Sequence, residues 1–485
     1  MTSTTTRTRF TSLLIATTIA TYVLIVLGTA VSTTGSADTC ATWPSCSTEW
    51  AIGPITSDGL LFWGHRAVAL VTGLLLAGAA YTASKIDLDR ATRAGLAFAC
   101  VLFPVQVGVG AALVVRESAL VGAAHLLLAM VIFGGLLVAL VRTLEIHSES
   151  TAGTPASTVD ARSIEPAPDD SSDPDPVAAT DGGGENASSS GRLAELRKTV
   201  GAYVTLTKPK LMWLLCLVAL AGMGLATLTG ATLEPAVVAA TLLGGVLAIG
   251  ASGTFNHVHE RDRDRKMQRT SDRPLVHDRV PVANAICFGV VLTVTSALVM
   301  LVWVNLLATL LTLAAIGYYV VLYTVLLKPN TAWNTVLGGG AGALPALIGW
   351  VAVTGSVDLP ALVLAAVIFL WTPAHFYSLA IAYREDYAKG GFPMFPVVAG
   401  DLVARRHIML YLGATLLAVS LLGWIAGLGW LYALTSIALG TVFLRSVVRQ
   451  YHDPTKEVAL RSFYVSNYYL GAILIAIIVE TLLLA

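Results

Sequence analysis

The stretch Asn256-His-Val-His-Glu260-Arg-Asp-Arg-Asp264 places acids and bases between two long apolar runs of this 485-residue chain. Asn256, Glu260 and Asp264 recur every four residues, and residues four apart on a helix lie about 40° apart around its axis. The spacing therefore predicts an amide and two carboxylates on one helix face, an oxygen-rich site suited to Mg²⁺. The alternative is a charged loop that only marks the cytoplasmic side of a membrane.

Basic residues are interleaved with these acids and follow them, as an anionic ligand would require. They are Arg261, Arg263, Arg265, Lys266, Arg269 and Arg273. A metal site, a phosphate site and apolar flanks together suggest chemistry on a lipid diphosphate at a membrane surface.

The composition excludes a soluble domain. Hydrophobic residues make up 55% of the chain and charged residues 12%, whereas soluble domains carry about 25% charged residues. The first apolar run, from about Phe10 to Val31, is long enough to span a bilayer and lacks a clear cleavage site, so we expect a span there. We expect an all-α polytopic membrane protein in contact with membrane lipid, with no nucleic-acid partner.

Thirteen apolar runs have about the length that a transmembrane helix needs. Four are centred near Ile19, Thr72, Leu102 and Met130, and nine near Ala219, Leu243, Thr293, Thr312, Ala343, Ala366, Leu416, Ile437 and Ile473. The loop 32–60 contains no Lys or Arg, whereas Arg7, Arg9 and the loop after Asp264 are basic. The positive-inside rule therefore predicts a multi-pass protein of the cell membrane with its N-terminus and charged stretch on the cytoplasmic side.

A polar linker divides the chain. Residues 148–195 are rich in Ser, Pro, Gly, Ala and Asp, and we expect them to form a disordered acidic tether on the cytoplasmic side. The end of this stretch, from Arg192 to Tyr203, can form a short amphipathic helix on the membrane surface. The predicted domains are a four-helix unit at 1–147 and a nine-helix unit at 196–485.

A set of ordered motifs marks the second unit. Besides residues 256–274, it comprises Tyr203-Val-Thr-Leu-Thr-Lys208-Pro209-Lys210, Met267-Gln-Arg269-Thr270-Ser-Asp-Arg273-Pro274, Tyr323-Thr-Val-Leu-Leu-Lys328, Asn334-Thr-Val-Leu-Gly-Gly-Gly-Ala-Gly-Ala-Leu-Pro345, Trp371-Thr-Pro-Ala-His375-Phe and Tyr383-Arg384-Glu385-Asp386-Tyr387-Ala-Lys389-Gly-Gly-Phe-Pro-Met394-Phe-Pro396. Together these resemble the UbiA-type intramembrane prenyltransferases and, more narrowly, the protohaem IX farnesyltransferases, or haem O synthases.

The resemblance implies a nine-helix transmembrane bundle with a central cavity that opens to the cytoplasm and to lipid. It implies that Asn256, Glu260 and Asp264 hold Mg²⁺ on farnesyl diphosphate, and that Glu385 and Asp386 form a second motif that holds another Mg²⁺. The candidates for binding the diphosphate are Lys266, Arg269, Arg273, Lys328 and Arg384.

Two further features have alternative interpretations. His375 is a candidate haem contact by the resemblance, and a satisfied structural hydrogen bond is the alternative. The glycine run 338–340 is expected to allow close helix packing, with a phosphate-binding loop as the alternative.

The implied reaction transfers a farnesyl group from farnesyl diphosphate to a vinyl group of protohaem IX, which gives haem O and diphosphate. Mg²⁺ and the bases would neutralise the leaving group, and the vinyl group would attack the resulting allylic cation. One alternative is a UbiA-type prenyltransferase for a quinone or an archaeal lipid. Another, from a different class, is a haem-binding transporter or redox membrane protein.

The first unit contains two histidines, His65 and His125, near the outer ends of predicted spans. Imidazole pairs inside a four-helix bundle can ligate haem, and the outer loop holds Cys40 and Cys46, where a disulfide is permitted. With Thr34-Gly-Ser36, Arg66 and Gln106, these residues resemble one half of haem A synthase, which implies that both histidines are axial haem ligands.

One departure limits what this unit is expected to do. Phe62 stands where the haem A synthase family often has Glu, so we expect the unit to bind haem, to dimerise or to pass haem to the second unit, and not to oxidise haem alone. The possible partners are haem A synthase, the terminal-oxidase assembly machinery and a second copy of the chain.

Overall fold

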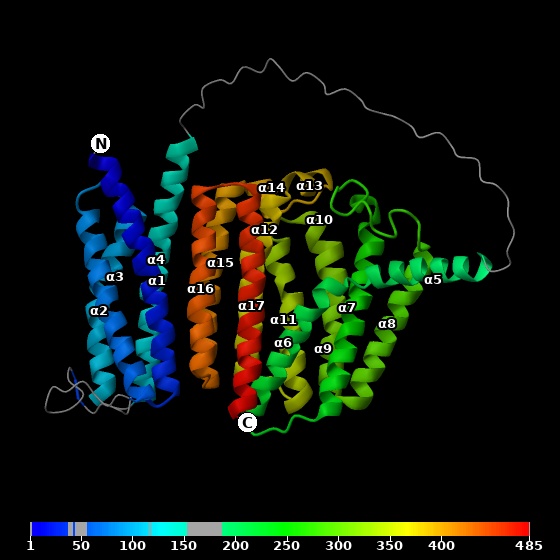
Figure 1. The fold of residues 1–485 in the computed structure, drawn as a ribbon, viewed down its shortest axis with the longest axis horizontal. Helices are drawn as coiled ribbons and strands as arrows, with labels where there is room; N and C mark the ends of the chain where they lie inside the picture. The colour runs from blue at the N-terminus through cyan, green and yellow to red at the C-terminus, as the bar shows by residue number, and fades with distance from the viewer. Residues whose placement is uncertain (1, 37–41, 44–55, 116–117, 153–186, 485) are drawn as a thin grey trace, which may run out of the picture.

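The computed structural model describes residues 2–36, 42–43, 56–115, 118–152 and 187–484, and these form long helices joined by short turns (Figure 1). In this part of the chain, 13 helical stretches are long and apolar enough to cross a membrane. Each of the 13 contains one of the predicted centres, so the expected all-α fold and the predicted positions of 13 candidate spans are confirmed for the described residues.

The helices of the first unit precede those of the second along the chain. The first unit contains α1 (Thr2–Thr33), α2 (Ser57–Ala83), α3 (Arg90–Val115) and α4 (Ala119–Ala152). The spans of the second unit are α6 (Pro209–Thr227), α7 (Pro235–Asp264), α8 (Val282–Trp303), the stretch α9 (Leu306–Gly317), η2 (Tyr318–Leu327) and α10 (Lys328–Asn330), then α11 (Asn334–Thr354), α12 (Leu359–Ala382), α15 (Asp401–Ala426), α16 (Trp430–His452) and α17 (Lys456–Leu484).

Three short elements lie outside the spans. The helices α13 (Arg384–Lys389) and α14 (Phe395–Ala399) lie at the end of the bundle where the N-terminus lies (Figure 1). The helix α5 (Ala187–Leu206) runs across the direction of the spans, and its residues 194–201 are exposed. A helix near the predicted Arg192–Tyr203 segment is therefore confirmed.

The predicted linker, residues 148–195, overlaps the end of α4 and the start of α5. Helix α4 continues to Ala152, because its last turns pack on the second unit and Ser148 Oγ donates to Leu144 O at 3.0 Å and to Tyr451 O at 3.1 Å. Residues 148–152 and 187–195 are thus helical rather than irregular. The middle of the expected linker, 153–186, lies outside the described residues.

Glycines let two spans of the second unit touch along their backbones. A Cβ on Gly349 of α11 would overlap the carbonyl of Ala219 in α6, and a Cβ on Gly222 of α6 would overlap the carbonyl of Ala346. Since small residues allow close helix approach in a membrane, this pair forms a rigid contact in the bundle.

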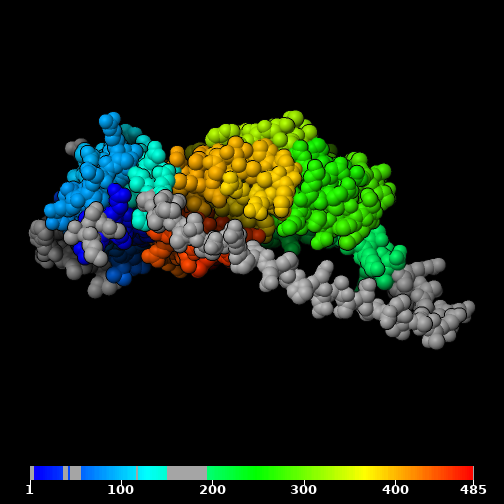
Figure 2. Space-filling view, turned by 90° about the horizontal axis from the view of Figure 1, so that it is seen from above, coloured from blue at the N-terminus to red at the C-terminus, as the bar shows by residue number. Residues whose placement is uncertain are grey.

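The two units are packed together. Helices α1 and α4 lie against α15 and α16, and residues from both units share one hydrophobic core (Figures 1 and 2). Tyr22 of α1 shares a 2.6 Å hydrogen bond with Ser436 of α16, and Arg406 Nε of α15 lies 2.5 Å from Glu145 Oε1 of α4. The seam between the units is therefore a specific interface and more than a consequence of the linker.

Candidate active site

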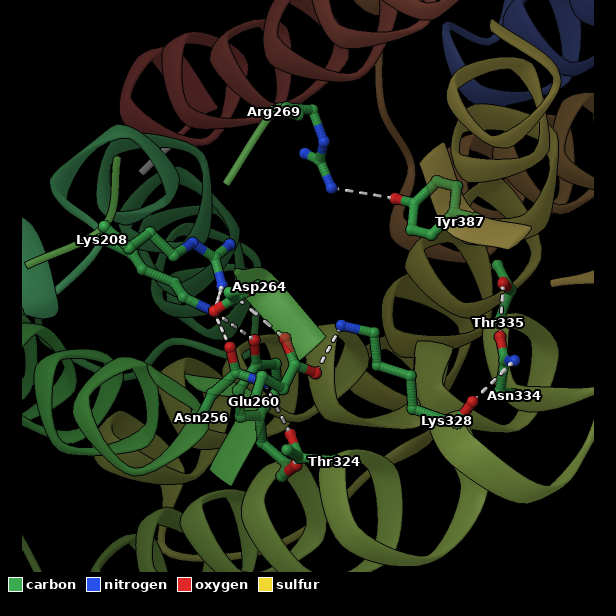
Figure 3. Close-up of polar contacts among 12 residues, drawn as sticks. Lys208, Asn256, Glu260, Asp264, Arg269, Thr324, Lys328, Asn334, Thr335 and Tyr387 are labelled. Atoms are coloured by element: carbon green, nitrogen blue, oxygen red, sulfur yellow. Dashed lines mark hydrogen bonds and ion pairs between the residues drawn. The ribbon is translucent and has the colours of Figure 1, made fainter. Parts of the chain in front are cut away.

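The end of α7 presents three buried oxygen-bearing side chains on one face. Asn256, Glu260 and Asp264 are each at most 2% exposed, and Figure 3 shows them side by side. They lie on one helix face, as their spacing predicts. The helix can expose this polar face to the bundle interior because it meets groups of opposite charge there.

Each of these side chains contacts a different cation (Figure 3). Lys208 Nζ donates to Asn256 Oδ1, and Lys328 Nζ pairs with Glu260 Oε1. Arg273 Nη1 lies 2.6 Å from Asp264 Oδ2 and 3.7 Å from Glu260 Oε2. The three cations come from segments before α6, at the end of η2 and after α7, so only the tertiary fold brings them together.

The backbone of Lys208 is unusual. Its φ is 55°, in the left-handed region, and Pro209 follows as the first residue of α6. A Cβ on Gly253 of α7 would lie 2.9 Å from Leu206 O, so this glycine lets α7 approach the turn that carries Lys208. The combination directs the lysine side chain at the oxygen face.

Burial lowers the pKa of Lys208 to about 8, although the nearby Glu260 favours the charged form. A lysine with this pKa is still a cation at neutral pH. Its ammonium also lies 3.2 Å from Tyr319 OH, so two oxygen atoms orient it.

The π-helical stretch η2 lines the other side of this cluster. Thr324 Oγ1 accepts a hydrogen bond from Asn256 Nδ2 at 3.1 Å and donates to Tyr319 O at 2.9 Å. The π turn, a feature frequent at functional sites, thus contacts Asn256 through Thr324 and Lys208 through Tyr319. This holds the amide of Asn256 with its oxygen toward Lys208.

The glycine run 338–340 of α11 packs against η2. A Cβ on Gly338 would overlap the ring of Tyr323, and a Cβ on Gly340 would lie 2.5 Å from Tyr318 OH. These contacts support close helix packing as the role of the run, rather than the alternative of a phosphate-binding loop.

The second acidic motif lies on α13 and performs a structural task. Asp386 Oδ1 and Oδ2 accept hydrogen bonds from the backbone amides of Gln268 and Arg269, each at 3.0 Å. Asp386 therefore fastens the basic loop after α7 to α13. Its neighbour Glu385 is exposed.

The remaining predicted diphosphate ligands differ in position. Arg269 lies across from the α7 cluster, where its guanidinium is 5.5 Å from the ring centroids of Tyr383 and Tyr387 and donates to Tyr387 OH at 3.2 Å (Figure 3). Burial raises the pKa of Tyr387, so its hydroxyl stays protonated. Lys266 and Arg384 are exposed, and Arg384 lies 3.7 Å from Asp401. The structure thus brings Arg273 and Lys328 to the oxygen face. Lys266 and Arg384 lie at the edge of the site.

The donor atoms of the oxygen face are of the type that binds Mg²⁺. No group of three or more His, Cys, Asp or Glu side chains within the described ranges is arranged to hold a metal. Mg²⁺ commonly takes one or two carboxylates and completes its shell with phosphate oxygens and water. Asp264 Oδ1 is buried and has no hydrogen-bond partner within those ranges, so one carboxylate oxygen beside Glu260 can serve as a ligand.

Comparison with known proteins shows the family of this chain. The model of the UbiA prenyltransferase family matches residues 215–470. The protein named "Protoheme IX farnesyltransferase" from Haloarcula marismortui is 49% identical over 483 residues, 98% of this chain and 99% of that protein. The chain belongs to the protohaem IX farnesyltransferases of the UbiA family. It is therefore a multi-pass membrane enzyme of the prenyltransferase class.

Two further proteins are similar to this chain. A protein of the same name from Mycobacterium sp. (strain KMS) is 42% identical over 300 residues, 61% of this chain and 95% of that protein. A solved structure described as a digeranylgeranylglyceryl phosphate synthase is 16% identical and covers 58% of this chain and 98% of that one, with a TM-score of 0.49.

In this prenyltransferase, His375 has a complete packing environment. Its ring stacks on Trp371 at 4.3 Å and on Phe463 at 4.2 Å between centroids, and its Nδ1 lies 2.6 Å from Ser466 Oγ. The contact with Ser466 is the structural hydrogen bond that the sequence analysis gave as the alternative role of His375. The haem contact stays a prediction.

The histidines of the first unit face glycines on neighbouring helices. A Cβ on Gly28 would lie 3.1 Å from His65 Cε1, and a Cβ on Gly110 would lie 2.9 Å from His125 Cε1. The Nδ1 atoms of both rings are buried and have no hydrogen-bond partner in the described structure. The predicted disulfide, Cys40 with Cys46, lies outside the described residues.

Lys208 and Tyr319, which contact each other in this candidate site, were not assigned a role from the sequence. Lys208 stands in a quoted motif, and a base directly before the proline that starts a span was the signal that could have identified it. Tyr319 lies in an apolar run, and nothing in its sequence context distinguishes it from a lipid-facing aromatic residue.

Proposed function

We propose that this enzyme transfers the farnesyl group of farnesyl diphosphate to a vinyl group of protohaem IX and so produces haem O. The observation that carries the proposal is the buried oxygen face of α7 with Lys208, Lys328 and Arg273 upon it. The identity of 49% to a protein named for this reaction, over 98% of the chain, supports the choice of substrates.

The cations make the leaving group possible. A diphosphate leaves readily only when its negative charge is neutralised in a site with little water. Arg273 can grip phosphate oxygens with two parallel N–H groups, and Lys208 and Lys328 act as point charges. Mg²⁺, held by Asn256, Glu260 and Asp264 together with phosphate oxygens, would add positive charge on the same group.

The bond changes then need no protein nucleophile. The bond between farnesyl C1 and its oxygen breaks, and its electron pair leaves with the diphosphate. The π pair of the vinyl group forms the new carbon–carbon bond, and water adds to the resulting cation and loses a proton. The apolar helices around the site exclude other water until that step.

We also propose a second Mg²⁺ at α13, as the resemblance implies. Glu385 is the exposed carboxylate there. Asp386 accepts one amide hydrogen bond on each oxygen, and a carboxylate oxygen has a further lone pair for a metal. Of the two residues, Glu385 is the one whose contacts leave it free to approach the ligand.

The haem product tests the main proposal. The full chain is expressed in a strain that lacks its own haem O synthase, and extracted haem is analysed by mass. We expect a species heavier than protohaem by one farnesyl group and one hydroxyl group, and its loss in Asp264→Ala. A prenylated quinone or lipid in place of this species would favour the alternative substrates. Prenylation that persists in the variant would refute the metal role of Asp264.

For the first unit, we propose that His65 and His125 ligate a haem. A buried ring nitrogen without a partner is costly, and Nδ1 of both rings has none in the described structure, whereas Nε2 of His125 lies 3.2 Å from Gln106 Nε2. The mycobacterial relative is 95% covered by 300 aligned residues, which supports placing the transfer chemistry in the second unit alone. An unchanged haem spectrum of the purified His65→Ala protein would exclude this residue as a ligand.

We place the N-terminus and the prenyl diphosphate site on the cytoplasmic side of the cell membrane. The basic loop after α7, α13 and the N-terminus lie at one end of the bundle (Figure 1), and basic residues favour that side. Contacts with haem A synthase, with the terminal-oxidase assembly machinery or with a second copy stay predictions.

A further inference from the structure

A small groove lies between α16 and α17, near the loop that joins them. Arg445 and Arg449 from α16 and Arg461 from α17 line it, and its volume is about 190 Å³. Because α16 ends at His452 and α17 begins at Lys456, the groove lies close to the ends of two spans. Lipid headgroups meet a membrane protein near the ends of its spans.

The three arginines have no carboxylate partner. None of them forms an ion pair or a side-chain hydrogen bond within the structure described, and no acidic residue lines the groove. By contrast, Arg384 and Arg406 lie 3.7 Å and 2.5 Å from carboxylate oxygens. The groove therefore concentrates three positive charges that have no ion-pair partner in the described structure.

The floor of the groove is ordered and mixed in polarity. Ser462 is fully buried, and its hydroxyl donates to Ser446 O at 3.1 Å, which ties α17 to α16. Val458, which is 7% exposed, adds apolar surface. The guanidinium groups supply forked donors, so the site combines an ordered floor with a cationic rim.

We propose that this groove binds the phosphate headgroup of an anionic membrane lipid. Arginine matches phosphate oxygens in a bidentate fork, and basic residues at a membrane surface attract anionic lipids. The exposed side chains of Val442, Tyr464 and Tyr468 continue from the groove along the same helices, so acyl chains can lie on them. The volume suits a headgroup and is too small for a porphyrin. The proposal is independent of the transfer reaction.

Lipid binding by the purified full-length protein tests it. Native mass spectrometry counts bound phosphatidylglycerol and, as the neutral comparison, phosphatidylcholine. Each arginine near the surface contributes about fivefold to binding of anionic lipid, so we expect Arg445→Gln/Arg449→Gln to bind phosphatidylglycerol about 25-fold more weakly. The matched control is Arg90→Gln/Arg93→Gln, which removes two exposed charges from the first unit and should bind as the wild type does.

Three outcomes would overturn the proposal. They are wild-type binding by the groove variant, an equal loss in the control, and displacement of the lipid by an equal concentration of inorganic phosphate or protohaem, which would mean a site for a soluble anion. Should the double variant fail to fold, Arg461→Gln replaces it. An approximately fivefold loss would then support the site, and unchanged binding would refute it.

Discussion

Lys208 occupies a backbone conformation that side chains other than glycine rarely adopt, with φ at 55°. Strain of this kind persists where the surrounding structure holds it, and it is frequent at functional sites. The proline that follows, the glycine of α7 opposite and the hydrogen bonds to Asn256 and Tyr319 supply that support. The lysine is therefore placed before any substrate arrives.

The pKa of Lys208 leads to a prediction on pH. Lys208 is a cation below pH 8 and loses its proton above it, so kcat/KM for farnesyl diphosphate should fall about tenfold per pH unit above that point. In Lys208→Arg, whose side chain stays charged, this alkaline decline should disappear. Initial rates between pH 6 and 10 measure both, and the same decline in the variant would assign it to another group.

The effect of Lys208 on stability has the opposite sign to this decline in activity. The unfolded chain has a lysine pKa of about 10.5, above the folded value of about 8. Between these values the unfolded state binds more protons, so this residue's contribution to stability rises with pH. Loss of the Lys208 proton should thus lower activity without lowering stability, and a thermal melt at each pH shows whether the protein is still folded where activity declines.

The acid face supplies a second prediction at the residue scale. Asp264→Asn should lower kcat by about 10²–10³, the loss typical of removing one electrostatic group from a transition-state site. Asp262→Asn is the matched control, since this carboxylate lies two residues away and is exposed. Similar losses in both variants would show that the general charge of the loop matters, and not the buried face.

At the scale of elements, the close contact between α6 and α11 depends on Gly349, which has no Cβ. Gly349→Ala should destabilise the protein by about 1–3 kcal/mol or more, because the added carbon meets the backbone of Ala219, which cannot rotate away. Gly342→Ala on the same helix is the control, since its Cβ would meet Ile368 at an ordinary 3.8 Å. Thermal melts of the two purified variants should therefore differ, and equal midpoints would contradict the close contact.

At the scale of the whole molecule, the seam between the units rests on a buried carboxylate. Glu145 is 4% exposed and pairs with Arg406 from the other unit. If the purified protein is cut within 153–186 by an engineered protease site, the two halves should stay together. In Arg406→Glu they should separate on size exclusion, because two carboxylates would then meet in a buried seam. Arg197→Glu, on exposed α5, is the control, and separation in that variant would contradict the role of the seam.

The sequence by itself determined the helical fold, the 13 candidate spans and the oxygen face of α7. These features are local, because a bilayer requires about 20 apolar residues per span and a four-residue spacing makes one helix face. The ordered motifs also indicated the family.

Only the tertiary structure decided which bases meet that face, that Asp386 holds a loop, and that the two units share a seam. The contacts of Lys208, Lys328 and Asp386 join residues 48, 68 and 118 positions apart. Such pairings depend on how the helices pack together, which the pattern along one helix does not contain.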